Sequence, residues 1–183
     1  MDGVTPEATH GQTHHAADDV TLTDATVDEE LALLVMTWRN DPVTLAASFH
    51  VEPKEWPAFL GEYRGFFDGD PRVVPPLFGV AGGERVAFLR FRPAEDPEGL
   101  GRSACDISIN VAPAARGRGL GRALIVAATE RALGSFDVVL AEIKPGNAAS
   151  VRAFEGAGYR PIAVGVHDVD GSPIAVERLV AAR

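Results

Sequence analysis

A short loop rich in glycine and arginine is the part of this sequence best suited to binding phosphate. Residues 116–121 read RGRGLG and join a β-like run to a segment of helical pattern. Glycine has no Cβ, so its backbone can approach a ligand closely, and a helix start offers unpaired N–H groups to an anion. Arg116, Arg118 and Arg122 add positive charge there. On these residues alone, a glycine-rich turn with solvated arginines stays the alternative.

Two other nucleotide-binding patterns fit this loop less well. The mononucleotide pattern G-x-x-x-x-G-K-[ST] is absent, because Arg122 stands where the pattern needs its Lys-Ser/Thr pair. The order of a strand, a glycine loop, a helix and a next strand containing Glu142 is also that of the first unit of a dinucleotide-binding fold. However, Arg122 also occupies the third-glycine position counted from Gly117, the loop is long, and three predicted strands precede this unit. We therefore do not expect a dinucleotide site.

The strand that leads into the loop alternates strictly between apolar and polar residues. Residues 104–111 read ACDISINV, and the residues of such a strand point alternately to its two faces. The apolar face carries Cys105, Ile107, Ile109 and Val111, and the polar face carries Asp106, Ser108 and Asn110. We expect Cys105 to be a buried small hydrophobe and not a nucleophile.

Two motifs together resemble those of the GNAT superfamily of acetyltransferases. The first, V-x-P-x-x-R-G-x-G-x-G at residues 111–121, resembles the end of the family's fourth strand, its pyrophosphate loop and the next helix start. The second, N-x-x-S-x-x-x-F-E-x-x-G-Y at residues 147–159, resembles a later family signature. They occur in the correct order, and the resemblance covers roughly residues 20–180. It implies an N-acetyltransferase that uses acetyl-CoA.

The resemblance also implies where acetyl-CoA binds. The backbone amides of Arg118–Ala123 would hold the CoA diphosphate, and Ile109–Val111 would pair with pantetheine in a wedge between strands four and five. Asn147 would lie near the cofactor at the start of the last long helix, where it also suits an N-cap. The expected cofactor contacts are Ile109, Val111, Arg116, Gly117, Arg118, Gly119, Gly121, Arg122, Ala123, Asn147, Ser150 and Phe154.

Members of this family usually transfer acetyl directly to a neutral amine. An alkyl amine with a pKa of about 10.4 is mostly protonated at pH 7, so a group must accept its proton. Asp106 stands where many family members place a Glu general base acting through water, and we expect it in this role. The alternative for Asp106 is a structural or acceptor-positioning carboxylate. The backbone N–H of Val111 is expected to meet the developing oxyanion.

The general acid is not assigned by this resemblance. The family often supplies a Tyr to protonate the departing CoA thiolate, but the matching residue here is Phe154. A thiol with a pKa of about 8.5 leaves tolerably near neutral pH, so water or Ser150 stays open as the donor. We expect Tyr159 to be a packing residue.

The segment between the first two predicted helices is expected to line the acceptor site. Residues 38–42 and 55–56 resemble a subgroup near the ribosomal-protein N-terminal acetyltransferases and, still closer, acetyltransferases of amino-sugar nucleotides. Arg39, Asn40 and His50 are therefore candidates to contact a primary amine of a small molecule, of amino-sugar type, or of a protein N-terminus. Arg39 suits a substrate phosphate or carboxylate. Helix capping and loop structure are the alternative for each residue.

The periodicity predicts an α/β sandwich about a mixed sheet, which the resemblance implies is splayed between strands four and five. A capping box at Thr26 and Glu29 starts the first helix, and Asp41-Pro42 ends it. The remaining predicted elements are a short strand over 20–23, a helix over 53–63, a hairpin of strands 77–80 and 86–89, strand 104–111, helix 119–133, strand 138–143, helix 147–157, and strands 160–166 and 174–180 joined through Asp170-Gly171. We expect a tail over residues 1–18 and one domain over 19–183.

Composition bounds the partners and the location. The formal net charge of −9 argues against nucleic acid or an anionic membrane as partner and weakly favours a cationic acceptor. We expect a cytoplasmic protein, because the chain has one cysteine, no signal-like start and no apolar run of about 18 residues. A monomer or a homodimer is expected, and the sequence does not distinguish the two. His10, His14 and His15 lack nearby partner ligands, so we expect no metal. A non-catalytic acyl-CoA-binding sensor or partner module remains the alternative function.

Overall fold

A seven-stranded sheet organises the chain in a computed structural model that describes residues 20–68, 74–169 and 171–183. The elements are β1 (Val20–Asp24), α1 (Glu29–Arg39), α2 (Pro42–Ala47), α3 (Ala58–Gly65), β2 (Leu77–Ala81), β3 (Glu84–Ala94), β4 (Ala104–Val111), a 3-10 turn (Pro113–Ala115), α4 (Leu120–Leu133), β5 (Val138–Ile143), α5 (Ala148–Gly156), β6 (Arg160–Val169) and β7 (Ser172–Ala182). The expected tail, with its three histidines, and Asp170 lie outside the described residues.

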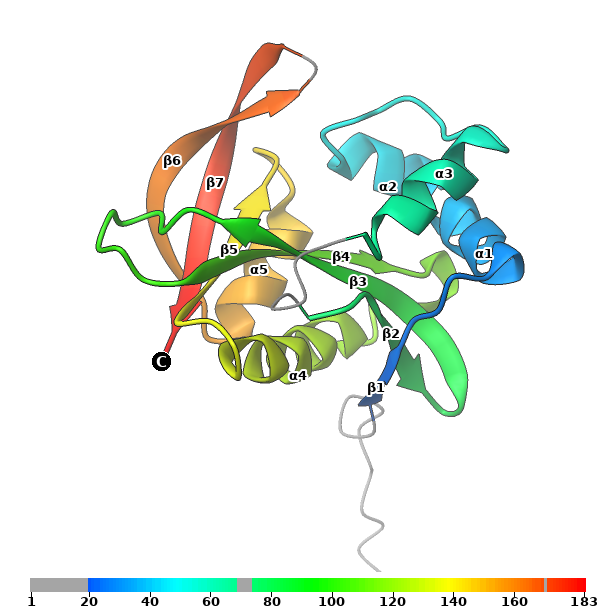
Figure 1. Cartoon of the computed structure of the whole chain (residues 1–183), viewed down its shortest axis with the longest axis horizontal. Helices are drawn as coiled ribbons and strands as arrows, with labels where there is room; N and C mark the ends of the chain where they lie inside the picture. The colour runs from blue at the N-terminus through cyan, green and yellow to red at the C-terminus, as the bar shows by residue number, and fades with distance from the viewer. Residues whose placement is uncertain (1–19, 69–73, 170) are drawn as a thin grey trace, which may run out of the picture.

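The sheet is antiparallel except at its centre. Its strand order is β1-β2-β3-β4-β5-β7-β6, and only β4 and β5 pair in parallel. Figure 1 shows α1, α2 and α3 on one side of the sheet and α4 and α5 on the other. The mixed α/β architecture expected from the sequence is therefore confirmed.

The two central strands separate after three paired positions. Their pairing runs from Ala104 with Val138 to Asp106 with Leu140 and stops there. Beyond this point β4 stays paired with β3 as far as Val111, whereas β5 stays paired with β7 as far as Ile143. Each strand thus follows its other neighbour, and the twist of the two half-sheets carries them apart. The expected splay between strands four and five is present.

The apolar face of β4 packs into the core beneath α4. Cys105 has no exposed surface, and burial raises the pKa of its thiol to about 12, so the expected inert role fits its place. Leu120, Leu124 and Ile125 of α4 are fully or almost fully buried in the same core. No helix in the described ranges is long and apolar enough to cross a membrane.

The structure corrects three helix boundaries. The N-cap of α1 is Asp28, whose carboxylate accepts the Leu31 N–H at 2.9 Å, and not Thr26. Asp41-Pro42 starts a further helix, α2, because Asp suits the N-cap and proline suits the first helical position. The helix expected from Pro53 begins only after Pro57, since a proline inside it would lack the N–H that a helix needs.

Two glycines in different environments test the packing of α4 on the sheet. A Cβ on Gly79 would lie 2.6 Å from both methyl carbons of the buried Leu124, whereas a Cβ on Gly61 in α3 would meet nothing within 4 Å. We predict that Gly79→Ala lowers the free energy of unfolding by about 1–3 kcal/mol. Gly61→Ala should raise it by about 0.5–1 kcal/mol, because alanine favours a helix. Denaturant unfolding of both variants checks this, and equal effects would contradict the packing.

Candidate active site

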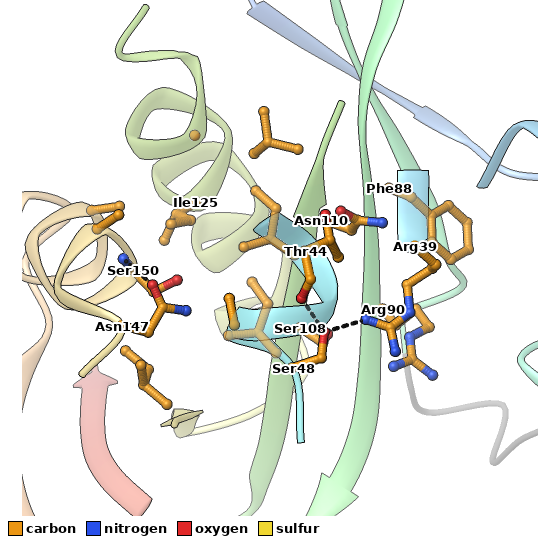
Figure 2. Close-up of a pocket in the computed structure, with 18 of the residues that line it drawn as sticks. Arg39, Thr44, Ser48, Phe88, Arg90, Ser108, Asn110, Ile125, Asn147 and Ser150 are labelled. Carbon is orange, nitrogen blue, oxygen red and sulfur yellow. Dashed lines mark hydrogen bonds between the residues drawn. The ribbon is translucent and has the colours of Figure 1, made fainter. Parts of the chain in front are cut away.

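A cavity of about 890 Å³ lies at the fork between β4 and β5. Figure 2 shows Asn147 and Ser150 of α5 on one side of β4, and Arg39 and Arg90 on the other. The lining residues come from both groups that the sequence singled out, the expected cofactor contacts and the expected acceptor contacts. A second cavity, of about 600 Å³, shares Arg92, Asp106 and Glu142 with the first.

The edge of β4 beside this cavity has no strand partner. Pairing with β5 ends at Asp106, so residues 107–111 border the fork without a neighbouring strand on that side. The side-chain nitrogen of Asn110 is buried and has no hydrogen-bond partner among the described residues. Backbone and amide groups of this kind are normally paired, so this edge is suited to a ligand that hydrogen-bonds like a strand.

The glycine loop, residues 116–121, adjoins the open end of that edge. Gly117 and Gly119 have φ angles of 74° and 77°, a region that L side chains rarely adopt. Gly119 is also the N-cap of α4 and offers no side chain to the first N–H groups of the helix. A Cβ on Gly117 would meet nothing within 4 Å, so open space lies in front of this part of the loop. This combination suits an anionic group at the helix start.

Arg116 is committed to a protein contact. Its guanidinium lies 2.6 Å from a carboxylate oxygen of Asp41 and 2.6 Å from the Thr44 hydroxyl, and its Nε donates to the Val111 carbonyl at 3.3 Å. The hydrogen bond from the Arg116 guanidinium to the Asp41 carboxylate is the main reason that the pKa of Asp41 is lowered. Arg116 therefore ties the glycine loop to the first turn of α2, although it also lines the cavity.

The other end of α2 is held by β5. Lys144 follows β5, and its ammonium group donates to the carbonyls of Ala46 at 3.0 Å and Ser48 at 3.2 Å. Carbonyls at a helix end lack partners within the helix, so a cation is favoured there. With Arg116 at its start and Lys144 at its end, α2 bridges the fork between the two half-sheets.

Asp106 lies at the point where the strands separate. Its side chain is only 13% exposed, and Arg92 on the neighbouring strand donates to it at 3.1 Å. Burial is the largest influence on the pKa of Asp106 and raises it, and the charge of Glu142 acts in the same direction. Arg92 lowers it but is itself 57% exposed, so water screens this pair. The net direction is upward, as is useful for a proton acceptor.

Glu142 and His167 form the β5 and β6 wall of the cavity. One Glu142 oxygen accepts from Arg178 at 2.8 Å, and the other lies 2.7 Å from Nδ1 of His167. The His167 ring stacks on Phe49 with ring centres 4.7 Å apart. The loop after α2 is thereby attached to β6. Together with the contacts of Arg116 and Lys144, this is the third contact that holds α2 and its loop over the cavity.

The start of α5 lies where the sequence places it. The Asn147 side chain accepts the Ser150 N–H at 3.2 Å, so Asn147 is the N-cap while it also lines the cavity with Ser150 and Phe154. Tyr159 does not reach the cavity. Its hydroxyl lies 2.8 Å from that of Thr129, and burial raises its pKa, in keeping with a packing role.

Other sequence-predicted residues divide between the cavity and its surroundings. Arg39 and His50 line it, but Asn40 does not, because its amide bonds both backbone groups of Lys54, at 2.6 and 2.8 Å. Arg118 and Ala123 are also not among the lining residues. Arg118 is exposed, and the Ala123 N–H donates to the Gly119 carbonyl at 3.4 Å.

Sequence reasoning missed the arginines of β3. Arg90 and Arg92 both line the cavity, on the same face of β3 as the buried Phe88. A signal was present in the sequence, because side chains of a strand alternate between its faces and Phe88 therefore shares one face with Arg90 and Arg92. A face that carries a phenylalanine beside two arginines is not typical of a fully solvated one. Lys144 and His167 gave no comparable signal, since their roles depend on contacts between distant segments.

Comparisons with known proteins agree with this geometry. The model of the acetyltransferase (GNAT) family matches residues 33–159. The search of curated proteins finds no significant match.

Similar solved structures cover almost the whole chain. The aminoglycoside acetyltransferase AAC(6')-Ib in complex with ribostamycin and coenzyme A is 20% identical, with a TM-score of 0.71 over 91% of this chain and 94% of that one. The yncA protein of Salmonella typhimurium with its cofactor acetyl-CoA is 22% identical, with a TM-score of 0.61 over 89% and 93%. An aminoglycoside N(6')-acetyltransferase of Legionella pneumophila is 16% identical, with a TM-score of 0.68 over 89% and 91%.

At these identities the structural likeness establishes the fold, and the family match establishes the relationship. The matched residues span both the fork and the glycine loop, and they extend over more than half of the sequence. The chain therefore belongs to the GNAT family of acetyltransferases and is an acetyl-CoA-dependent acetyltransferase.

Proposed function

We propose that this protein acetylates a primary amine of a small molecule, with Asp106 as the proton acceptor. The observation that carries the proposal is the position of Asp106, a buried carboxylate at the fork, between an open strand edge and a cluster of acceptor-side polar residues. The amino-sugar type of acceptor stays the first candidate, and a protein N-terminus the second. The proposed enzyme has a single domain over residues 19–183 and works in the cytoplasm as a monomer or homodimer.

The residues around the fork fit acetyl-CoA. Residues 107–111 offer an unpaired strand edge for the amide groups of pantetheine, and the uncapped start of α4 suits the diphosphate. Arg122 lines the cavity at that end, and its aliphatic part lies near Gly156 of α5. When bound there, acetyl-CoA supplies an acetyl group activated as a thioester.

Asp106 has the properties that proton removal from an ammonium group requires. Its raised pKa brings it closer to the operating pH than an exposed carboxylate, which makes proton acceptance less unfavourable. The nearby carboxylate of Glu142 adds to the negative potential that attracts an ammonium group. A water molecule between Asp106 and the amine would relay the proton, as the short Asp side chain favours.

The end of β4 is proposed to stabilise negative charge on the acetyl oxygen. The Val111 carbonyl is held by Arg116, which fixes the orientation of the peptide groups at this point. The N–H of Val111 is the proposed donor to that oxygen, where a preorganised dipole is most effective. Phe154 has no proton to give, so Ser150 or a water molecule is the proposed donor to the departing thiolate.

Replacing Asp106 distinguishes a catalytic role of this carboxylate from a structural one. We predict that Asp106→Asn lowers kcat/KM by about 100-fold to 10,000-fold, the usual contribution of a general base. Because burial raises the folded-state pKa, the ionised carboxylate costs stability at pH 7, and that cost disappears as the pH falls below this pKa. Asp106→Asn should therefore leave the free energy of unfolding at pH 7 unchanged or raise it.

Asp137 is the matched control for Asp106. It joins the starts of β4 and β5 through Ser103, and these hydrogen bonds lower its pKa. Its stabilising effect is therefore present above its unfolded-state pKa, so Asp137→Asn should lower stability at pH 7 and leave turnover intact. Turnover in Asp106→Asn that stays at the wild-type level across the pH range would contradict the role of Asp106.

Two glycines with similar backbone strain test the acetyl-CoA site. We predict that Gly117→Ala weakens acetyl-CoA binding by about tenfold, or about 1.4 kcal/mol, because Gly117 lines the cavity and the added methyl group enters the open space in front of the loop. Gly101 has a φ of 75° and open surroundings outside the cavity, so Gly101→Ala should carry the same strain without this loss. Titration calorimetry with acetyl-CoA measures both, and equal affinities would contradict the placement of the diphosphate.

A further inference from the structure

The acceptor side of the cavity has more positive charge than its carboxylates neutralise. Four cations in or beside this part of the cavity already have carboxylate partners: Arg92 with Asp106, Lys54 with Glu62, Arg116 with Asp41, and Arg178 with Glu142. Among the residues that the structure describes, no carboxylate lies within ion-pair distance of Arg39 or Arg90. This excess occurs in a chain whose formal net charge is −9, so it is a local feature and not a consequence of composition.

Arg90 has no hydrogen-bond partner among the described residues. Its guanidinium lies over the ring of Phe66, 4.2 Å from the ring centre, which supports it from one side only. Arg39 makes one such bond, to the Ser48 hydroxyl at 2.7 Å. A guanidinium has five N–H donors, so both groups keep most of theirs available toward the cavity.

The two guanidinium groups are close enough to repel one another. Figure 2 shows Arg39 and Arg90 together on the β3 side of the cavity. Burial, with repulsion from Arg92 and Arg39, lowers the pKa of Arg90 to about 10, although the charges of Glu62 and Asp106 act in the opposite direction. Burial also lowers the pKa of Arg39, against the charge of Glu62. Keeping two such charges partly buried, with no ion-pair partner in the described part of the chain, costs free energy, and an anion between them would reduce that cost.

We propose that Arg39 and Arg90 form a subsite for an anionic group, a carboxylate or a phosphate, on the amine that is acetylated. This inference deepens the proposed function and rests on it. Guanidinium groups bind both anions through paired, parallel N–H donors, so their shared chemistry is what the subsite recognises.

The sheet register sets the anionic group beside the reacting amine. Arg90 lies opposite Ser108 and Arg92 lies opposite Asp106, on the same face of the sheet. The two positions on β4 are two residues apart, or about 7 Å along a strand. A compact acceptor can therefore place its amine near Asp106 while its anion reaches Arg90 and Arg39. Polycationic amines are disfavoured, because their other ammonium groups would face these arginines.

The first test compares pairs of amines, one with and one without an anionic group, with rates compared at equal concentrations of the neutral amine. Glucosamine 6-phosphate is paired with glucosamine, methionine is paired with methioninamide, and spermidine serves as a polycation. We expect kcat/KM for at least one anionic amine to exceed that of its neutral partner by about tenfold to hundredfold, mostly through KM. The two pairs separate phosphate from carboxylate as the recognised group. Equal values within both pairs, or a preference for spermidine, would overturn the subsite.

Variants assign the preference to the two arginines. Arg90→Met and Arg39→Met should each reduce the ratio of kcat/KM between the preferred anionic amine and its neutral partner by at least tenfold. Arg85→Met is the matched control, because Arg85 belongs to the same strand and lies over the Phe78 ring at 5.3 Å, but outside the cavity. It should keep the wild-type ratio. A rise in the KM for acetyl-CoA in place of this change would assign the arginines to the cofactor.

Calorimetry with CoA present separates failure of the subsite from failure of the proposed function. Binding of an anionic amine to the wild-type protein, lost in Arg90→Met, together with no acetylation of any amine, would support the subsite and contradict the proposed function. Acetylation with equal efficiency within both pairs of amines would support the function and contradict the subsite. Because no variant is needed for the wild-type comparison, poor folding of Arg90→Met would leave that test intact.

Discussion

The separation of β4 from β5 after Asp106 and Leu140 is the constraint on which the site depends. Two parallel strands would normally pair along their length and satisfy each other's backbone groups. Here each strand follows its outer neighbour, so residues 107–111 of β4 keep an edge free in the middle of the sheet. An interior edge of this kind is costly unless a ligand covers it, and it is also protected from pairing with another chain by its position.

The fork also determines the electrostatics of the cavity. A carboxylate at the last paired position cannot be fully solvated, so Asp106 is buried and its pKa is raised. The helix that spans the opening has to be held from both half-sheets, and Arg116 and Lys144 do this through the two ends of α2. Because Arg116 is bound to Asp41 and Thr44, the start of α4 and Arg122 are the groups left to attract the phosphates of a ligand. Stability and function thus depend on the same few charged contacts.

Much of this fold follows from local patterns. The strict alternation of residues 104–111 predicted β4 with its observed bounds, and it also predicted the buried Cys105. The two motifs around residues 111–121 and 147–159 led to the GNAT family, which the family comparison confirms. The helix α2 was missed because Asp41-Pro42 was interpreted as a helix end, although the same pair is an effective helix start.

The parts of the site that were missed depend on contacts across the fold. Nothing local to Lys144 indicates that it would reach carbonyls some 100 residues earlier in the chain, and the stacking of His167 on Phe49 depends equally on tertiary structure. Arg90 is the exception, since the alternation of the strand places it on the same face as Phe88, which already indicates that this face is partly covered. The roles of Asp106, Val111 and the acceptor-side residues remain proposals that rest on their place at the fork.

Hydrogen exchange of the β4 amides with and without CoA tests the central claim most directly. If the free edge of β4 receives pantetheine, the amides among residues 107–111 that face the fork should exchange more slowly when CoA is bound. Those that face β3 should change little, because β3 already protects them. Slower exchange confined to the start of α4, with no change over residues 107–111, would contradict the account, because the ligand would then be held without using the fork.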